Sequence, residues 1–321
     1  MILAGGLGTR LRPLTFLLPK PMVPVMNRPL LEHTLTLLKK HHVDEIVFLL
    51  FYLPELIRSH FGDGSRFGVK IDYLVAREDF GTAGALKQAA HFIDEPVFLL
   101  SGDAITDIDL IRLREFHAAR RALATIALSS VPNPSPFGVA MTDKQNRITR
   151  FVEKPAWSEI FSDTVSMGIY VLQPEILDFI PANQAVYFAK DIFPDLLHQN
   201  RALYGFVDAC YWKDIGDLRA YQQVHWDILS GAVELDIAAG TAQRQGGTVF
   251  LGKNCKIHDQ ARLHHVVIGD NCAIGRHSSL AHTVLWNNVT IGQDCEVVDS
   301  VIACDSVVED GTTIEQDVFV G

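Results

Sequence analysis

The sequence predicts an α/β protein in which a Rossmann-like domain with a mixed, mostly parallel sheet precedes a left-handed parallel β-helix. Up to about residue 230, short apolar segments alternate with helical segments, as is typical of a parallel sheet covered by helices. After about residue 248, aliphatic residues recur at about every sixth position instead. We therefore expect a first domain over residues 1–230, a linker over 231–247 and a β-helix over 248–321.

The first domain opens with a short apolar strand at residues 1–4, and five further apolar segments predict strands. These segments cover residues 45–51, 69–74, 97–101, 124–130 and 168–172. Segments with a helical pattern lie between and after them, at residues 30–40, 83–91, 109–120 and 217–229. The alternation of the two kinds of segment favours parallel strands joined by helices.

The second half repeats with steps of 6, 6 and 5 residues, so that each coil has 17 residues. Such coils are expected when three short strands wrap around a triangular prism. The aliphatic positions are Leu251, Ile257, Leu263, Ile268, Ile274, Leu280, Leu285, Ile291, Val297, Ile302, Val308, Ile314 and Val320. A small or branched residue follows each by four, and Cys255, Cys272 and Cys295 occupy this inward position. Packing therefore explains these cysteines better than redox or metal chemistry.

Composition limits the possible partners of the chain. It has 321 residues, 48% of them hydrophobic and 21% charged, with a formal net charge of -10. This charge argues against a nucleic-acid partner, because such surfaces are basic. No apolar run reaches the roughly 18 residues that span a bilayer, so we expect no membrane partner. Five cysteines without CxxC spacing favour free thiols and a cytoplasmic location.

The most informative segment is the glycine-rich and cationic stretch at residues 4–24, AGGLGTRLRPLTFLLPKPMVP. Its glycines permit positive φ and close approach of backbone N–H groups to an anion, and its cations suit phosphate oxygens. The residues concerned are Gly5, Gly6, Gly8, Arg10, Arg12 and Lys20. A glycine-rich turn after a strand is also common without any ligand. The dinucleotide fingerprint does not fit, since Pro13 interrupts the segment that should be helical.

Two aspartates are candidate metal ligands. Asp103 follows the strand expected at residues 97–101, at the carboxyl edge of the sheet, where open α/β folds bind ligands. Asp214 lies in YWKDIG, immediately before the helix expected at residues 217–229. Two carboxylates together with phosphate oxygens suit Mg²⁺. Spacing alone does not pair the two acids, and an isolated aspartate of this kind is more often a cap or loop residue.

Residues 5–25 match the signature GGxGTRLxPLTxxxPKPxxPV, and the chain resembles the sugar-1-phosphate nucleotidyltransferases. The resemblance implies that the loop binds a nucleoside triphosphate, that Arg10, Lys20 and Asp103 are catalytic, and that Asp103 and Asp214 hold Mg²⁺. The implied nucleotide-binding residues in this loop are Ala4, Gly5, Gly6, Gly8, Thr9 and Arg10. The segment GTAG, with Gly81, Thr82 and Gly84, is similar to the one that lies near the base in this family.

The same resemblance assigns the sugar-phosphate end of the site. Glu153 and Lys154 form the family's EKP motif, in which the acid receives sugar hydroxyls and the lysine pairs with the sugar phosphate. Gly138, in the segment FGV, is its usual companion. Ser166 falls where the family commonly has an asparagine that touches the sugar, so sugar identity is open at this position. An isolated Glu-Lys pair is, on its own, more often a solvated surface pair.

The resemblance implies that a sugar 1-phosphate attacks the α-phosphorus of a nucleoside triphosphate and releases pyrophosphate. The overall likeness is to mannose-1-phosphate guanylyltransferases of bacteria, which implies GTP and mannose 1-phosphate as substrates. The alternatives are uridylyl or thymidylyl transfer to glucose 1-phosphate, a non-catalytic regulatory subunit, and acyl transfer by the β-helix. The intact Arg10, Lys20, Asp103, Lys154 and Asp214 speak against a regulatory subunit. We also expect a homo-oligomer formed through the β-helix.

Overall fold

The computed structural model describes residues 1–233, 235, 241–244 and 247–321. It comprises two compact units, which we describe separately. The first unit is formed by Met1–Gly6 and Thr34–Trp212, and the second by Leu7–His33 and Lys213–Gly321. The glycine-rich stretch is therefore divided, since Gly5 and Gly6 belong to the first unit and its residues from Leu7 onward belong to the second. Of the linker expected at residues 231–247, residues 234, 236–240 and 245–246 lie outside the described residues.

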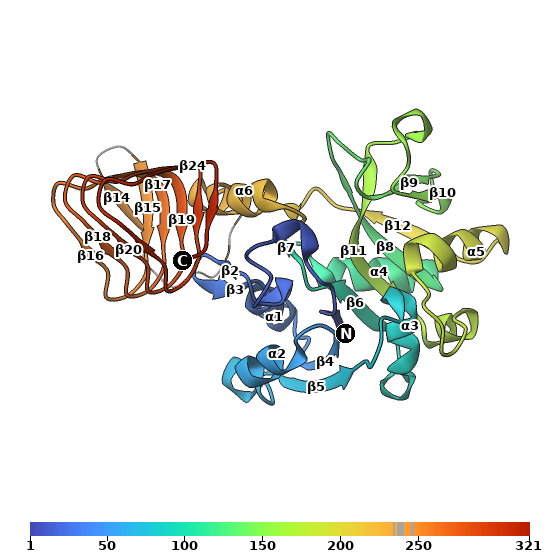
Figure 1. Cartoon of the computed structure of the whole chain (residues 1–321). Helices are drawn as coiled ribbons and strands as arrows, with labels where there is room; N and C mark the ends of the chain where they lie inside the picture. The colour runs from blue at the N-terminus through green and yellow to red at the C-terminus, as the bar shows by residue number, and fades with distance from the viewer. Residues whose placement is uncertain (234, 236–240, 245–246) are drawn as a thin grey trace. The chain divides into compact units, whose positions relative to one another are not determined.

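The first unit contains a nine-stranded mixed sheet with the order β10-β9-β11-β6-β1-β4-β5, in which β8 joins β11 and β12 joins β8 (Figure 1). Strands β1, β4, β5 and β6 are mutually parallel, whereas β11 runs antiparallel to β6. The strands of this sheet are β1 (Ile2–Leu3), β4 (Glu45–Leu50), β5 (Lys70–Val75), β6 (Val97–Ser101), β8 (Ala124–Ser130), β9 (Gly138–Thr142), β10 (Ile148–Glu153), β11 (Thr164–Leu172) and β12 (Leu203–Val207). Strand β7 (Ala104–Thr106) lies outside this sheet. The predicted Rossmann-like sheet is confirmed.

Helices cover this sheet, and their ends follow local sequence signals. Asp109 caps α4, because its carboxylate accepts hydrogen bonds from two amides in the first turn. Helix α4 packs on β8, β11 and β12, and α5 packs on β10 and β12. The helices are α1 (Leu30–Lys40), which begins in the second unit, α2 (Pro54–Phe61), α3 (Gly81–Gln88), α4 (Leu110–Arg120) and α5 (Phe193–His198). All four predicted helices are present, and α3 begins two residues earlier than expected.

The second unit contains the β-helix and α6 (Leu218–Leu229), whose N-cap is Asp217. The parallel register Ile257↔Ile274↔Ile291↔Val308 confirms the 17-residue coil, and Figure 1 shows the coils stacked in order. The strands of this unit are β2 (Pro24–Val25), β3 (Arg28–Pro29), β13 (Trp212–Asp214, which starts on the last residue of the first unit), β14 (Thr241–Arg244), β15 (Gly247–Leu251), β16 (Lys256–Ile257), β17 (Arg262–Ile268), β18 (Ala273–Ile274), β19 (Ser279–Leu285), β20 (Thr290–Ile291), β21 (Glu296–Val298), β22 (Val301–Ile302), β23 (Val307–Val308), β24 (Thr313–Glu315) and β25 (Val318–Phe319).

The interior of the β-helix follows the repeat up to its last coil. Cys272 and Cys295 are buried among the aliphatic residues, as predicted. All five cysteines, each of which the structure describes, are free thiols. Val320 is an exception, since its side chain is 53% exposed. Phe319 pairs with Ile302 and takes the interior position, because each coil advances by 17 residues. The prediction of an inward Val320 is therefore wrong by one residue.

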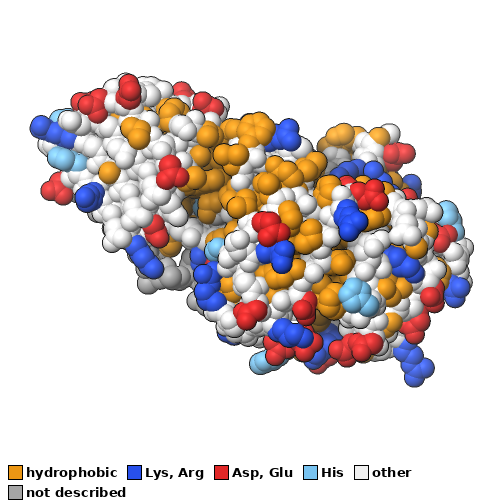
Figure 2. Space-filling view, turned by 60° about the horizontal axis from the view of Figure 1, so that its bottom comes forward, with side chains coloured by type: hydrophobic (Ala, Val, Ile, Leu, Met, Phe, Trp, Pro, Cys, Tyr) orange, Lys and Arg blue, Asp and Glu red, His pale blue; other side chains and the backbone are white. Residues whose placement is uncertain are grey.

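The surface carries both signs of charge. Figure 2 shows acidic and basic side chains interspersed on the face in view, with hydrophobic side chains between them. Among the residues that the structure describes, no helix has both the length and the apolar character needed to cross a membrane.

Candidate functional site

In the first unit, the candidate residues leave the sheet at the carboxyl ends of β1 and β6. Leu3 lies beside Ser101, and the amide of Gly102 donates to Leu3 O at 2.9 Å. The chain therefore enters the glycine-rich loop next to the turn that carries Asp103. Gly5 is packed closely here, because a Cβ would lie 3.0 Å from Phe51 Cβ. This is the sheet edge that the sequence predicts for ligand binding.

A buried tyrosine lies among three of the predicted residues. The hydroxyl of Ser166 donates to the Tyr170 hydroxyl at 3.4 Å, and both side chains are buried. Burial raises the pKa of Tyr170 to about 12, and the negative charges of Glu153 and Asp103 act in the same direction. The hydroxyl therefore keeps its proton at neutral pH. The Tyr170 hydroxyl is thus influenced by three residues that are distant from one another in sequence, Asp103, Glu153 and Ser166.

Glu153 and Lys154 differ in environment, although they are neighbours in sequence. The carboxylate of Glu153 is 19% exposed and burial raises its pKa, whereas the lysine side chain is 61% exposed. The ammonium of Lys154 lies 3.7 Å from the carboxylate. Gly138 lies opposite Glu153 in the sheet, and a Cβ there would approach Phe151 Cζ at 2.5 Å and Glu153 Oε2 at 2.9 Å. Glycine thus leaves space for the carboxylate.

The GTAG segment forms the first turn of α3, and three of its four amides are bonded within the protein. Two amides of the first turn, that of Gly84 among them, donate to Val186 O at 2.9 and 3.1 Å. A Cβ on Gly81 would lie 2.5 Å from the same oxygen. The Thr82 hydroxyl accepts a hydrogen bond from the amide of Phe188 at 3.0 Å. The glycines therefore serve close packing. The amide of Gly81 also has a partner, since it donates to Asp79 Oδ1 at 2.8 Å.

In the second unit, one glycine sets the path of the loop. Gly8 has a φ of 61°, and a Cβ there would lie 3.0 Å from Lys20 Cβ. The hydroxyl of Thr15 donates to Gly8 O at 2.8 Å and closes the turn. The loop therefore folds back on itself and brings Gly8 near Lys20. Gly5 and Gly6, which the structure also describes, do not have positive φ. Of these three glycines, only Gly8 therefore uses the positive φ that the sequence suggests.

Three predicted site residues meet in the second unit. The ammonium of Lys20 lies 3.6 Å from Asp214 Oδ1, and the two side chains are 10% and 21% exposed. A Cβ on Gly216 would lie 2.5 Å from Asp214 Oδ2 and 3.2 Å from a guanidinium nitrogen of Arg10. Two cations and one carboxylate thus share a small space that only glycine at 216 leaves open. The sequence did not predict this pairing, because the residues are far apart along the chain.

The donor set suits Mg²⁺ in its chemistry. Mg²⁺ prefers oxygen ligands and is usually bound by one or two carboxylates together with substrate phosphates and water. Asp103 and Asp214 supply one carboxylate in each unit. Within the described residues, no three or more His, Cys, Asp or Glu side chains form a group that could hold a metal ion. Either aspartate would therefore need further ligands, such as phosphate oxygens and water, to bind a metal ion.

Comparison with known proteins identifies the family. The model for nucleotidyl transferase matches residues 1–231, and the model for the EIF2B subunit epsilon LbH domain (LbH, left-handed β-helix) matches residues 234–321. The chain belongs to the nucleotidyl transferase family. The predicted family, enzyme class and β-helix are thereby confirmed.

Individual relatives agree with this assignment. The UTP–glucose-1-phosphate uridylyltransferase of Synechocystis sp. is 38% identical over 269 residues, covering 79% of this chain and 69% of that protein. The mannose-1-phosphate guanylyltransferase of Mycobacterium tuberculosis is 34% identical over 233 residues, covering 72% of this chain and 64% of that protein. The solved structure of HddC from Yersinia pseudotuberculosis aligns with a TM-score of 0.62 at 26% identity, covering 71% of this chain and 97% of HddC. The chain thus spans about two thirds of the two sequence relatives.

Two aromatic side chains of the first unit contact Ser166 and its neighbour Met167. Tyr170 bonds to Ser166, and the indole of Trp212 donates to Met167 O at 3.0 Å. The rings of Trp212 and Phe137 meet edge to face, 5.1 Å apart. The signals for both were present in the sequence, since Tyr170 follows Ser166 by four residues and Trp212 lies two residues before Asp214.

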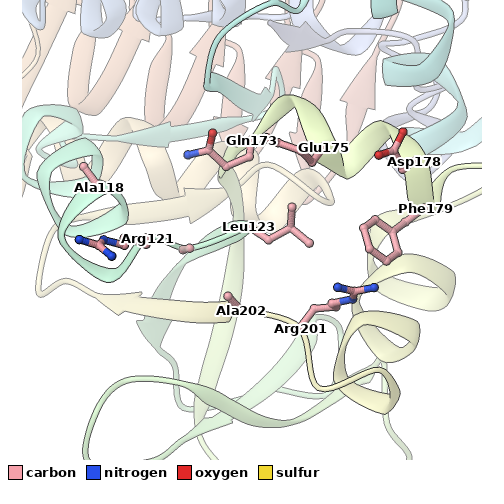
Figure 3. Close-up of a pocket in the computed structure, with 10 residues that line it drawn as sticks. Ala118, Arg121, Leu123, Gln173, Glu175, Asp178, Phe179, Arg201 and Ala202 are labelled. Carbon is pink, nitrogen blue, oxygen red and sulfur yellow. The ribbon is translucent and has the colours of Figure 1, made fainter.

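A cavity of about 950 Å³ lies elsewhere on the first unit, where β11 ends and β8 and β12 begin. This is the edge opposite the carboxyl end of β6, because β11 runs antiparallel to β6. Figure 3 shows Arg121 and Arg201 on opposite sides of the cavity, and the Arg201 guanidinium stacks on the Phe179 ring at 5.2 Å. The residues that line the cavity include none of the predicted site residues.

Proposed function

We propose that this chain transfers a nucleotidyl group from a nucleoside triphosphate to a sugar 1-phosphate, with GTP and mannose 1-phosphate as the preferred pair. The observation that carries the proposal is the meeting of Arg10, Lys20 and Asp214 in one place. Mannose-1-phosphate guanylyltransferases among the relatives support the choice of base and sugar.

The reaction is an in-line displacement. A phosphate oxygen of the sugar 1-phosphate forms a bond to the α-phosphorus of the triphosphate, while the bond from that phosphorus to the bridging oxygen of pyrophosphate breaks. The electron pair of that bond leaves with pyrophosphate. Such a step needs positioning and charge stabilisation rather than a covalent intermediate. It suits a site that offers cations and acids.

We assign Arg10 and Lys20 to the triphosphate. A guanidinium binds phosphate oxygens with a planar fork, and an ammonium adds a point charge. Asp103 and Asp214 would hold Mg²⁺, which supplies charge neutralisation at phosphate oxygens when bound. Lys20 already lies beside an anionic group, so its ammonium is oriented before the triphosphate arrives. The remaining loop residues and the GTAG segment stay assigned to the nucleotide on the resemblance alone.

We assign Glu153, Lys154 and Ser166 to the sugar phosphate. The exposed Lys154 side chain can extend to a phosphate, and the less exposed Glu153 carboxylate can accept hydroxyl groups. Gly138 gives that carboxylate its space. Ser166 has a shorter side chain than asparagine and already bonds to Tyr170, so it would contact the sugar less extensively.

Product formation tests the proposal. Pyrophosphate release is measured with each of four nucleoside triphosphates and several sugar 1-phosphates, with Mg²⁺ and with a chelator. We expect GTP with mannose 1-phosphate to be fastest, and the chelator to abolish turnover. If UTP with glucose 1-phosphate is best by a wide margin, the guanylyl assignment is wrong and the reaction class stands. Folded protein that turns over no pair would favour the regulatory alternative.

The metal assignment is tested by Asp103→Asn. We expect kcat to fall on the order of a hundredfold, as for the loss of one preorganised electrostatic contact. Asp94→Asn is the matched control, because Asp94 is an exposed aspartate outside the proposed site. Near-normal kcat and Mg²⁺ affinity in Asp103→Asn would contradict the assignment.

Assembly and location complete the proposal. We infer a homo-oligomer formed through the β-helix, whose Val307 side chain is 61% exposed beside the edge of the coils. Light scattering at micromolar concentration checks this, and a monomer would contradict it. A cytoplasmic location stays a prediction that rests on the free cysteines.

A further inference from the structure

We infer that the hydroxyl of Tyr221 positions the loop segment that carries Lys20, by joining this segment to the β-helix. Tyr221 is a positioning residue in this role, since it touches the loop and not the reacting atoms. The inference rests on the proposed function of Lys20. It gives the β-helix an indirect role in the reaction, because the β-helix helps to hold the segment that carries Lys20.

The central observation is a pair of hydrogen bonds at one buried hydroxyl. Tyr221 donates to Pro24 O at 2.7 Å and accepts from the indole nitrogen of Trp286 at 2.8 Å. Both aromatic side chains are buried. Tyr221 belongs to the first half of α6, Pro24 begins β2, and Trp286 directly follows β19 of the β-helix. One oxygen atom thus connects three segments of the second unit.

A second contact fixes the same hairpin to the neighbouring coil. The side-chain amide of Asn27 donates to Ile268 O at 2.8 Å. Met26 and Asn27 both have positive φ, as in the tight turn of a hairpin. Ile268 ends β17 and pairs with Leu285, the residue before Trp286. Two successive coils therefore hold the β2–β3 hairpin.

The hairpin also has an internal support. The Nε2 of His33 donates to Val25 O at 2.9 Å, so the carbonyl groups of two consecutive residues, Pro24 and Val25, have buried partners. Upstream, the amide of Val23 donates to Lys20 O at 3.1 Å. Lys20 is thus separated from the Tyr221 contact by a single short turn whose ends are both fixed.

Helix α6 contacts the loop through Tyr221, and it begins shortly after Asp214, the residue that pairs with Lys20. Asp214 lies seven residues before Tyr221, and Lys20 lies four residues before Pro24. The Lys20–Asp214 ion pair and the Tyr221–Pro24 hydrogen bond therefore close a small ring of contacts. Loss of the hydroxyl would open this ring and free Lys20 from its place beside Asp214. A displacement of about 1 Å can cost roughly a hundredfold in rate.

The kinetic test uses Tyr221→Phe, Trp286→Phe and the double variant. We expect kcat/KM for GTP to fall roughly tenfold or more in Tyr221→Phe, and KM for mannose 1-phosphate to stay within about twofold of the wild-type value. Trp286→Phe should have a smaller effect in the same direction. The double variant should be no worse than Tyr221→Phe, because the indole acts only through the hydroxyl.

Two matched controls separate positioning from general loss of packing. Tyr73→Phe removes a hydroxyl that donates to Gly62 O at 2.6 Å in the first unit. Trp226→Phe alters an aromatic ring of α6 that packs on His282 of the β-helix. Both controls should keep the wild-type kinetics. If Tyr221→Phe matches Tyr73→Phe, or if KM for mannose 1-phosphate rises as much as KM for GTP, the inference is overturned.

A second measurement is independent of turnover. Hydrogen exchange, followed by mass spectrometry on substrate-free protein, should be faster at residues 20–27 in Tyr221→Phe and unchanged in α4. Unchanged exchange at residues 20–27 would overturn the inference. If the wild-type chain turns over no substrate pair, the proposed function fails, and exchange at residues 20–27 then decides whether the hydroxyl holds the loop.

Discussion

The ion pair between Lys20 and Asp214 offers a direct test of the charge arrangement. Asp214→Asn keeps the shape of the side chain and removes the negative charge that lies 3.6 Å from the ammonium. Because the lysine side chain is only 10% exposed, little water can replace the lost partner. We expect Asp214→Asn and Lys20→Met each to lower the free energy of unfolding.

The geometry bounds the size of the effect. For unit charges at this separation, Coulomb's law gives about 1 kcal/mol in bulk water and about 5 kcal/mol at an effective dielectric constant of 20. Exposed pairs are worth about 0.2–1 kcal/mol, whereas removing one partner of a buried pair costs about 3–5 kcal/mol. The Lys20 and Asp214 side chains are 10% and 21% exposed, so the pair is intermediate between an exposed and a fully buried ion pair. We expect a coupling energy of about 1–3 kcal/mol.

The assay is urea unfolding of the wild type, both single variants and the double variant. The double-mutant cycle isolates the pair from the other interactions of either residue. Arg58 and Glu55, which are 3.0 Å apart and 49% and 73% exposed, form the control pair, with an expected coupling of about 0.5 kcal/mol or less. A Lys20–Asp214 coupling below about 0.3 kcal/mol would refute the reasoning.

Two further predictions concern pH and a glycine. Burial lowers the pKa of His33 and of His225 to about 4. Below about pH 6.5 the unfolded chain therefore binds more protons than the folded one, and the free energy of unfolding should fall as the pH drops from 6.5 towards 4. Urea midpoints that are equal at pH 7 and pH 5 would contradict this. Gly138→Ala places a Cβ against Phe151 and Glu153 and should cost about 1–3 kcal/mol of stability and raise KM for the sugar phosphate. An unchanged KM in steady-state kinetics would show that the Glu153 carboxylate needs no such space.

The predictions from sequence were most accurate where the pattern is local. The 17-residue repeat depends on which side chains point inward in each strand, and the register Ile257↔Ile274 follows it directly. Val320 lies 18 residues after Ile302, whereas the 17-residue coil places Phe319 inward. Helix α1 was predicted at its observed bounds, since its apolar stripe is continuous.

The functional segments were found in sequence, but their internal contacts were not. The GTAG segment forms the first turn of α3, two residues before the predicted start, and the amide of Gly84 bonds to Val186 O. Val186 lies in a distant loop, and no local propensity predicts where that loop packs. The same limit applies to Tyr170, whose hydroxyl lies near Glu153 and Asp103 only because three strands meet in one sheet.

By itself, the sequence determined that an α/β domain precedes a β-helix, and it identified the charged residues and the glycines of the candidate site. The period of the hydrophobic residues and the short motifs depend only on residues that are close in sequence, so both can be recognised without knowing the fold. Only the tertiary structure decided which of these residues meet: Lys20 with Asp214, and Pro24 with Tyr221 and Trp286. Hydrogen bonds and ion pairs act over about 3 Å, and such distances between remote residues depend on how every intervening turn directs the chain.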